Sequence, residues 1–274
     1  MDNRRNRVIA HELLEALARS RQVRPYTSQP QGLSVEAAYA VSAEILRMRR
    51  ARGERPVGRK IGFTNRGIWA EYGVSRPIWN YVYDSTIRYA LNDAGVQSLK
   101  GALEPKIEPE IVLCLKSAPH PGMGEEELAG CIEWLAHGYE IVQSPYPEWK
   151  FQGADTVAAF GLHGVLIVGT PCQVGAEAAQ YRELAEKMRS FRISLFCDGQ
   201  LRDSGAGANV LGSPLLALKH LVEVLAHQPV HHMLEPGEVI TTGTLTAALP
   251  IKAGETWHTA LTGLDLPGLA VRFV

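Results

Sequence analysis

Apolar and polar positions follow two different periods along this chain, and the change falls near residue 56. Before it, the segments 9–19 and 35–50 repeat apolar side chains every three to four residues, with Ser34 and Gly53 placed to begin and end the second helix. After it, helical periodicity returns only at 125–137, 176–189 and 214–226. Short apolar runs predict strands at 57–63, 110–115, 139–142, 164–168, 193–197, 239–242 and 269–273. Because many strands share few helices, the pattern predicts an α+β fold with a mixed, largely antiparallel core.

This pattern divides the chain into a helical N-terminal layer at residues 1–55 and a catalytic mixed-β domain at residues 56–274. The chain has 274 residues, of which 46% are hydrophobic, and this is enough for a substantial core. The N-terminal helices carry apolar stripes that must pack on the β core or on another subunit, so we expect a homo-oligomer. A complex with a pathway enzyme is a second alternative for the partner.

Charge and cysteine usage narrow the class of partner. With 28 basic and 29 acidic residues, the formal net charge of -1 gives no global attraction for nucleic acid or for an anionic membrane. The first residues contain no long apolar stretch, so neither a signal peptide nor a membrane anchor is expected. The four cysteines are widely spaced without a CxxC pair, which is typical of reduced proteins. These features favour a cytoplasmic protein that acts on a small molecule.

The stretch 108–115 contains the strongest chemical signal of the chain. Side chains alternate faces on a strand, so Glu108 and Glu110 point the same way while Pro109 points to the other face. Two like charges side by side on a half-buried strand repel each other and are costly to desolvate, unless a cation lies between them. The pair therefore suggests a hard divalent metal. A solvated edge strand with an acidic face is the alternative, because prolines and charges are common on edge strands.

Two further segments carry a charged side chain in apolar surroundings. Lys60 lies on a predicted strand between two glycines, whose missing side chains let backbone or ligand approach closely. Glu140 lies in an apolar strand, and the predicted helix 125–137 would return that strand to the side of Glu108 and Glu110. Three carboxylates with water suit octahedral Mg²⁺ or Mn²⁺ much better than zinc. For Lys60 or Glu140 alone, a surface ion pair is the more ordinary explanation.

Seven stretches in a fixed order carry a family resemblance over nearly the whole chain. They are Gly-Arg-Lys-Ile-Gly-Phe-Thr at 58–64, Glu-Pro-Glu-Ile at 108–111, Tyr-Glu-Ile-Val at 139–142, Asp-Thr-Val-Ala at 155–158, and the segments 204–214, 237–243 and 252–255. Together they resemble the 2-keto-4-pentenoate hydratase and 4-oxalocrotonate decarboxylase branch of the fumarylacetoacetate hydrolase superfamily.

The resemblance implies a distorted, mixed β-barrel-like core, similar to the C-terminal domain of fumarylacetoacetate hydrolase. It also implies a Mg²⁺ or Mn²⁺ ion held by Glu108, Glu110 and Glu140, and a small 2-oxo acid as substrate. Lys60 and Asp155 match stretches of the family pattern and are the catalytic residues that the resemblance implies, Lys60 as a positive charge or proton donor near the substrate.

The chain departs from the family pattern close to the expected substrate. Ala159 and Phe160 stand where the family usually has Asp-Asn, and Ile78 stands where an Asp is common. After the Glu-Ile-Val strand, Gln143 and Ser144 replace the usual residues. We therefore expect a more hydrophobic pocket that favours a bulkier or less polar substrate, with Trp149 as a further candidate for its border. The residues predicted to contact the substrate are Phe160, Leu162, Ile78, Gln143 and Ser144.

His163 belongs to the altered segment, which is predicted to form a loop from residue 155 to the following strand. It is a candidate replacement base, because histidine titrates near neutral pH. A structural hydrogen bond beside Gly164 is the more ordinary role for such a histidine.

Taken together, the residues and the resemblance predict a metal-dependent lyase that acts on a 2-oxo or 2-hydroxydienoic acid in aromatic catabolism. Hydration is expected ahead of decarboxylation. Hydrolysis of a C–C bond in an acylpyruvate is one alternative, because the wider superfamily uses the same metal carboxylates for it. A catalytically inactive paralogue that serves as a binding subunit is another.

Overall fold

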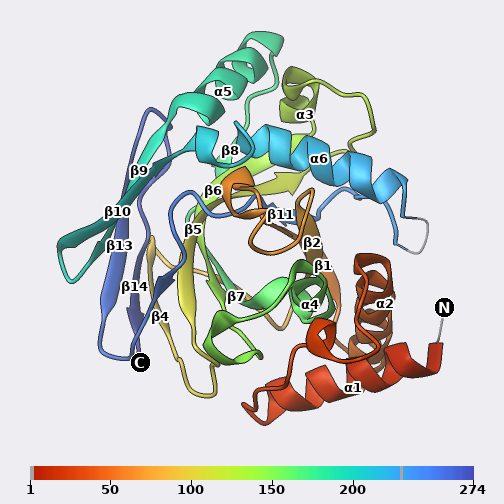
Figure 1. Cartoon of the computed structure of the whole chain (residues 1–274). Helices are drawn as coiled ribbons and strands as arrows, with labels where there is room; N and C mark the ends of the chain where they lie inside the picture. Colours follow the sequence, from red (N-terminus) through yellow and green to blue (C-terminus); the bar gives the residue numbers. More distant parts are fainter. Residues whose placement is uncertain (1–2, 229–230) are drawn as a thin grey trace.

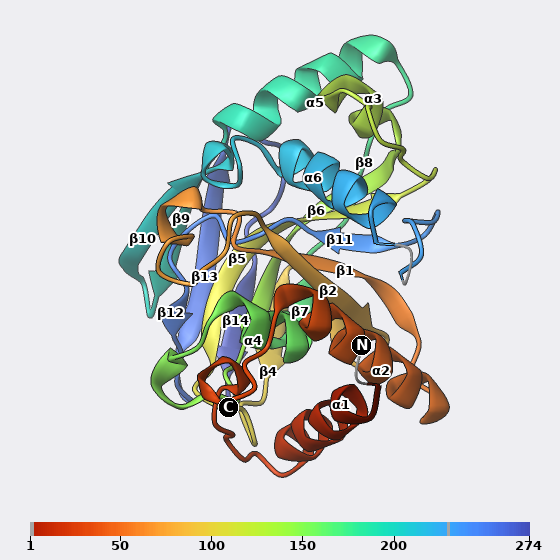
Figure 2. The ribbon, with the colours of Figure 1, turned by 45° about the vertical axis from the view of Figure 1, so that its right-hand side comes forward.

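The helices of this protein gather on two opposite sides of its sheets (Figures 1 and 2). The computed structural model describes residues 3–228 and 231–274. On one side lie α3 (Glu125–Gly130), α5 (Ala178–Ser190) and α6 (Pro214–Ala226), and on the other lie α1 (Asn3–Ala18), α2 (Val35–Ala51) and α4 (Gly153–Ala158). The sheets between them hold the candidate site.

Within the described ranges the strands form a nine-stranded and a five-stranded sheet. The larger has the order β2-β1-β11-β5-β6-β7-β3, with β12 beside β5 and β8 beside β6, and the smaller has the order β10-β9-β13-β14-β4. The pairs β1–β11, β3–β7 and β4–β14 are parallel, whereas the other pairs are antiparallel, so the predicted mixed, largely antiparallel core is confirmed. The strands are β1 (Pro56–Gly62), β2 (Ile78–Tyr83), β3 (Ile87–Tyr89), β4 (Ala94–Gln97), β5 (Lys106–Leu115), β6 (Ile132–Val142), β7 (His163–Val168), β8 (Cys172–Gln173), β9 (Arg192–Cys197), β10 (Gln200–Ala206), β11 (Val239–Thr241), β12 (Leu249–Pro250), β13 (Thr256–Thr262) and β14 (Ala270–Phe273).

The two N-terminal helices share a hydrophobic core with the larger sheet. Ser34 caps α2, since its side chain accepts a hydrogen bond from the backbone N–H of Ala37 at 3.2 Å. The buried faces of both helices, including Leu13 and Ile45, belong to the same cluster as Leu113 of β5. The apolar stripes of these helices therefore pack on the β core of their own chain.

Each of the seven predicted strands is present, but the helix predicted over 125–137 is wrong beyond Gly130. The chain turns at Cys131 and enters β6, whose first half pairs with β5 from Leu115 to Val112. A short apolar run fits either a helix or a buried strand, and pairing with β5 decides the outcome here. The strand β2 was also missed, because all of its residues are buried and it lacks an alternating pattern.

The segment 155–163, predicted as a loop, is mostly helical. Helix α4 covers its first part, and a short 3-10 turn at Phe160–Leu162 leads directly into β7. Phe160, Gly161 and Leu162 all have positive φ, at 59°, 63° and 61°. Successive left-handed residues reverse the chain sharply, so adjacent side chains of this turn point in different directions.

Helix α6 is apolar because it is a core helix. The segment Gly207–Ala226 is long and apolar enough to cross a membrane by composition, but over half of its most apolar window is buried in the fold. The hydroxyl of Ser213 accepts a hydrogen bond from the backbone N–H of Leu215 at 3.1 Å and caps the helix, as the sequence predicts. Leu215, Leu218 and Val222 pack inward.

Candidate metal centre and adjoining cavity

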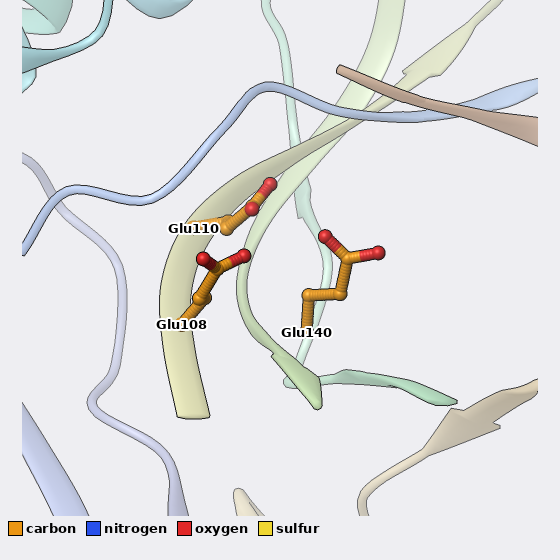
Figure 3. Close-up of side chains that lie close together, drawn as sticks. All are labelled: Glu108, Glu110 and Glu140. Carbon is orange, nitrogen blue, oxygen red and sulfur yellow. The ribbon is translucent and has the colours of Figure 1, made fainter. Parts of the chain in front are cut away.

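Three glutamates from two neighbouring strands meet inside the larger sheet. Glu108 and Glu110 lie on one face of β5 because they are two residues apart, and Glu140 of β6 pairs directly with Glu108. Carboxylate oxygens of the three residues lie within 4.8 Å of one another. Figure 3 shows the side chains turned toward a common centre. The three carboxylates converge as predicted, although direct strand pairing brings Glu140 there and a helical crossover does not.

Two of these carboxylates accept hydrogen bonds through one oxygen only. Glu110 Oε2 accepts hydrogen bonds from the backbone N–H of Gly243 at 2.7 Å and from the hydroxyl of Thr241. Glu140 Oε1 accepts a hydrogen bond from His163 Nδ1 at 2.7 Å. The other two oxygens, Glu110 Oε1 and Glu140 Oε2, are buried and have no hydrogen-bond partner among the described residues. In the described part of the chain, Glu140 Oε2 faces only the Lys60 ammonium. Because a buried carboxylate oxygen without a hydrogen bond is costly, this arrangement fits a cation between the two.

Lys60 of β1 brings a positive charge to the carboxylates. Its ammonium group donates a hydrogen bond to the carbonyl oxygen of Gly161 at 2.9 Å and lies 3.0 Å from Glu140 Oε2, with which it forms an ion pair. A Cβ atom at Gly161, where φ is +63°, would lie 2.8 Å from Lys60 Cδ, so glycine permits the close approach. Burial opposes the charge of Lys60, but the three carboxylates outweigh burial and raise its pKa.

The carboxylates carry more charge than Lys60 can balance. Burial raises the pKa of Glu108 to about 7, and burial together with Glu140 and Glu108 raises the pKa of Glu110 well above its usual range. Burial also opposes ionisation of Glu140, but Lys60 and His163 outweigh it and lower its pKa. With all groups ionised, one ammonium faces three carboxylates. This all-oxygen donor set with an excess of negative charge fits a hard divalent cation.

A cavity of about 150 Å³ adjoins Lys60 and Glu108. Thr244 and Asn65 add polar groups to its wall. Lys106 lies farther out, with its ammonium 3.8 Å from the centre of the Trp149 ring, and burial lowers its pKa. The remaining walls are largely apolar and include Ile61, Phe63, Ile68, Tyr72, Ile78, Val142, Trp149, Phe151 and Leu162. The cavity therefore suits a small molecule with a polar end near the carboxylates and an apolar body.

The predicted substrate contacts divide into two groups. Ile78 and Leu162 line the cavity, as does Trp149, the predicted border residue. Phe160 does not line it, because the reversal at 160–162 turns its ring toward Arg49, whose guanidinium lies 5.3 Å from the ring centre. The apolar wall is present, but Tyr72 and Phe151 supply the aromatic surface that the sequence assigned to Phe160.

Three other predicted residues have structural contacts away from the cavity wall. The carboxylate of Asp155 accepts hydrogen bonds from Thr27, at 3.0 Å from the backbone N–H and 2.5 Å from the hydroxyl, and from the backbone N–H of Gln152 at 3.0 Å. It caps α4 and ties the N-terminal layer to it, so these contacts give no support to a catalytic role. Ser144 exchanges hydrogen bonds with the backbone of Tyr146, and Gln143 accepts one from Leu103.

His163 lies behind the carboxylates and does not line the cavity. Its ring is buried, with Nδ1 on Glu140 and Nε2 at 2.9 Å from the hydroxyl of Thr86. Both ring nitrogens are thus engaged by protein groups, and the predicted role as a base that contacts water or substrate finds no support in this position.

Sequence reasoning missed the groups that hold Glu110. Thr241 and Gly243 belong to the stretch 237–243, which the sequence marks only as part of the family resemblance. Their contact with Glu110 depends on the antiparallel pairing of β11 with β5, in which Thr241 lies opposite Val112. At Gly243, φ is +104° and a Cβ atom would lie 2.2 Å from the Thr64 hydroxyl oxygen. In the sequence, the signal for this turn was the position of Gly243 just after the apolar run that forms β11.

Comparison with solved structures shows that the chain has the fold of fumarylacetoacetate hydrolase family proteins. A fumarylacetoacetate hydrolase family protein from yeast shares the fold with a TM-score of 0.54 at 17% identity, over 78% of this chain and 91% of that chain. The 4-oxalocrotonate decarboxylase from Pseudomonas putida G7, complexed with magnesium and adipate, superposes with a TM-score of 0.89 at 27% identity, over 100% of this chain and 99% of that one. No protein-family model matches the chain.

Sequence similarity gives a narrower assignment. A 2-hydroxyhexa-2,4-dienoate hydratase from Comamonas testosteroni is 32% identical over 256 residues, which are 92% of each chain. The chain therefore belongs to the family of 2-keto-4-pentenoate hydratases and 4-oxalocrotonate decarboxylases, whose members include lyases of both kinds. The family resemblance inferred from the sequence is confirmed.

Proposed function

We propose that this protein is a Mg²⁺- or Mn²⁺-dependent lyase that hydrates a 2-hydroxydienoic acid. The observation that carries the proposal is the convergence of Glu108, Glu110 and Glu140 within 4.8 Å, with buried oxygens on Glu110 and Glu140 that accept no hydrogen bond among the described residues, next to a cavity with a polar inner end and apolar walls. The sequence similarity to a dienoate hydratase along almost the whole chain supports the reaction class.

Each group at the inner end of the cavity has a definite part in this proposal. Glu108, Glu110 and Glu140 would hold the cation, which as a Lewis acid would stabilise negative charge on the 2-oxygen of the substrate. Lys60, fixed by the carbonyl of Gly161, places an ammonium beside the carboxylates, where it would attract the substrate carboxylate and could transfer a proton to the enolate oxygen.

The apolar wall has a separate part in the chemistry. Ile78, Leu162 and Phe151 surround the space into which the carbon chain of a dienoate would extend. They exclude bulk water from that chain, and this strengthens the electrostatic effect of Lys60 and the carboxylates. After the dienoate has ketonised to an enone, the water that adds to the far carbon of the enone double bond would enter from the side of Thr244 and Asn65, the polar groups of the wall.

Decarboxylation of a 2-oxo acid is the second candidate reaction. The similarity of the whole chain to a 4-oxalocrotonate decarboxylase structure supports it, and so does Lys106, a half-buried cation that could face a carboxylate at the far end of a diacid. Both reactions pass through the same dienolate, so the inner end of the cavity serves either one.

The experiment compares metal-free and reconstituted protein on substrates of both kinds. After treatment with EDTA, the protein would be assayed with 2-hydroxypenta-2,4-dienoate, 2-hydroxyhexa-2,4-dienoate and 4-oxalocrotonate, by loss of dienoate absorbance and by release of CO₂. We expect no turnover without metal, recovery with Mg²⁺ or Mn²⁺, and consumption of a dienoate without CO₂. Glu110→Gln should be inactive, and Glu133→Gln, an exposed change on β6, should be fully active.

Other outcomes would contradict the proposal in different ways. Release of CO₂ from 4-oxalocrotonate with no hydration would assign the protein to the decarboxylases. Cleavage of an acylpyruvate would assign it to the hydrolases. Metal binding by calorimetry without turnover of any 2-oxo acid would identify a binding subunit, and full activity after EDTA treatment would refute the metal-dependent mechanism.

We also propose that the protein works in the cytoplasm. Cys114, Cys131, Cys172 and Cys197 are all free, which is the state expected in a reducing compartment and supports this location.

A further inference from the structure

His163 connects one metal-binding carboxylate to a turn of the larger sheet. Its Nδ1 lies 2.7 Å from Glu140 Oε1, and its Nε2 lies 2.9 Å from the hydroxyl oxygen of Thr86. Thr86 is fixed in the turn between β2 and β3, where its hydroxyl oxygen accepts a hydrogen bond from the backbone N–H of Tyr83 at 3.2 Å. The chain of contacts therefore runs from the sheet through the ring to a single oxygen of Glu140.

The direction of these hydrogen bonds follows from what each group can do. An ionised carboxylate only accepts hydrogen bonds, so the ring nitrogen that faces Glu140 must carry a hydrogen. Nε2 faces the Thr86 hydroxyl, which has one hydrogen and can donate it either to Nε2 or to the carbonyl oxygen of Tyr83 at 3.1 Å. In both arrangements Nδ1 donates to the carboxylate, so the network commits Glu140 Oε1 to His163.

We propose that His163 is a positioning residue that leaves only Oε2 of Glu140, the oxygen beside Lys60, to a cation and thereby makes the site selective for small octahedral cations over Ca²⁺. The proposal rests on the metal site of the proposed function. Glu110 is limited in the same way by Thr241 and the N–H of Gly243. Mg²⁺ requires six ligands in near-ideal geometry, whereas Ca²⁺ accepts six to eight and often takes both oxygens of a carboxylate. Two one-oxygen carboxylates therefore disfavour the larger ion.

The test is calorimetric titration of the metal-free full chain with Mg²⁺, Mn²⁺ and Ca²⁺. His163→Asn keeps an N–H donor close to the position of Nδ1, and His163→Leu fills a similar space without a donor. We expect the leucine variant to bind Mg²⁺ roughly 10–100-fold more weakly. Its Ca²⁺ affinity should fall much less, because Glu140 Oε1 then becomes available to the ion beside Oε2. The asparagine variant should stay close to wild type in the ratio of the two affinities.

Two further variants separate selectivity from general packing. His231→Leu alters another buried histidine, whose ring contacts the Tyr81 hydroxyl at 2.9 Å and none of the three glutamates. It should cost stability without changing the ratio of Mg²⁺ to Ca²⁺ affinity. Thr86→Val keeps the His163 ring but removes its outer partner, so it should shift the ratio in the same direction as His163→Leu by a smaller factor. If His163→Leu does not fold, the ratio of Mg²⁺ to Ca²⁺ affinity in Thr86→Val tests the role of His163.

Equal weakening of Mg²⁺ and Ca²⁺ binding in His163→Leu, or an unchanged ratio in both His163→Leu and Thr86→Val, would overturn the proposal. Turnover with saturating Mg²⁺ keeps this result distinct from the proposed function. An active enzyme with an unchanged ratio overturns only the role of His163. A shifted ratio in a protein without turnover supports His163 and overturns only the proposed reaction.

Discussion

Replacement of Glu108 by Gln should make the metal-free protein more stable while weakening its metal binding. Gln has almost the same shape as Glu but no charge, so it relieves repulsion among Glu108, Glu110 and Glu140 without creating a cavity. In the folded protein the pKa of Glu108 is raised from 4.5 to about 7, chiefly by burial. Each pKa unit corresponds to about 1.4 kcal/mol, so the ionised side chain opposes folding by at most ~3 kcal/mol.

The sign of the pH dependence follows from the raised pKa. Glu108 contributes its full stability below the unfolded pKa, where it is protonated in both states, and that contribution is lost as the pH rises to about 7. Since Glu108 borders the cavity and water screens part of its charge, we expect a difference of about 1–3 kcal/mol between variant and wild type at pH 8. At pH 5 the difference should be much smaller.

Urea unfolding with EDTA at pH 5 and pH 8 measures this difference directly. Added Mg²⁺ should then stabilise the wild type by RT ln(1 + [L]/Kd) and Glu108→Gln far less. Glu133→Gln removes an exposed carboxylate from the same pair of strands. It should change neither the free energy of unfolding without metal nor the stabilisation by Mg²⁺. The electrostatic reasoning would be refuted by a Glu108→Gln protein less stable than wild type at pH 8 without metal, or by a difference that does not grow between pH 5 and pH 8.

The remaining predictions concern Lys60, Asp155, Trp149 and assembly. Lys60→Met should reduce turnover ~10²-fold or more while calorimetry still detects the metal, and retention of turnover would exclude its proposed proton transfer. Asp155→Asn should lower the free energy of unfolding by about 1 kcal/mol through loss of a helix cap, with turnover unchanged at 25 °C; a stable but inactive variant would restore its predicted catalytic role. Trp149→Ala should raise KM most for substrates with long tails, and equal effects on short and long dienoates would show that it does not contact the tail. The predicted homo-oligomer does not follow from the N-terminal stripes, because they pack on the β core of their own chain. Light scattering that reports a particle larger than the 30.0 kDa chain would support it, and a 30.0 kDa particle at micromolar concentration would contradict it.

The sequence predicts the strands best where local pattern and burial agree. Runs such as those of β5 and β9 are rich in branched apolar residues, and their positions were correct. The prediction of secondary structure fails where pairing with a neighbouring strand decides whether a segment forms a helix or a strand. Residues 132–137 carry apolar side chains that fit a helix, but the adjacent β5 offers a complete set of backbone partners and makes them a strand.

Some residues of the candidate site could be predicted from the sequence and others could not, for the same reason. The carboxylates could be predicted because the spacing of Glu108 and Glu110 fixes their common face on any strand. The roles of Phe160 and His163 could not be predicted from position in the sequence, because three successive left-handed residues decide where each side chain points. That turn directs Leu162 to the cavity, Phe160 to Arg49 and His163 to Glu140.

The direct pairing of Glu108 with Glu140 also bears on how the chain reaches its native state. A slip of one residue between β5 and β6 would turn Glu140 to the opposite face and leave the other two glutamates without a third acid. Only the native pairing assembles the complete ligand set, yet without a cation that same pairing brings like charges together. A cation present during folding would therefore stabilise the native alignment of β5 and β6 but not the misaligned one. Metal binding would in this way favour the correct pairing of these two strands.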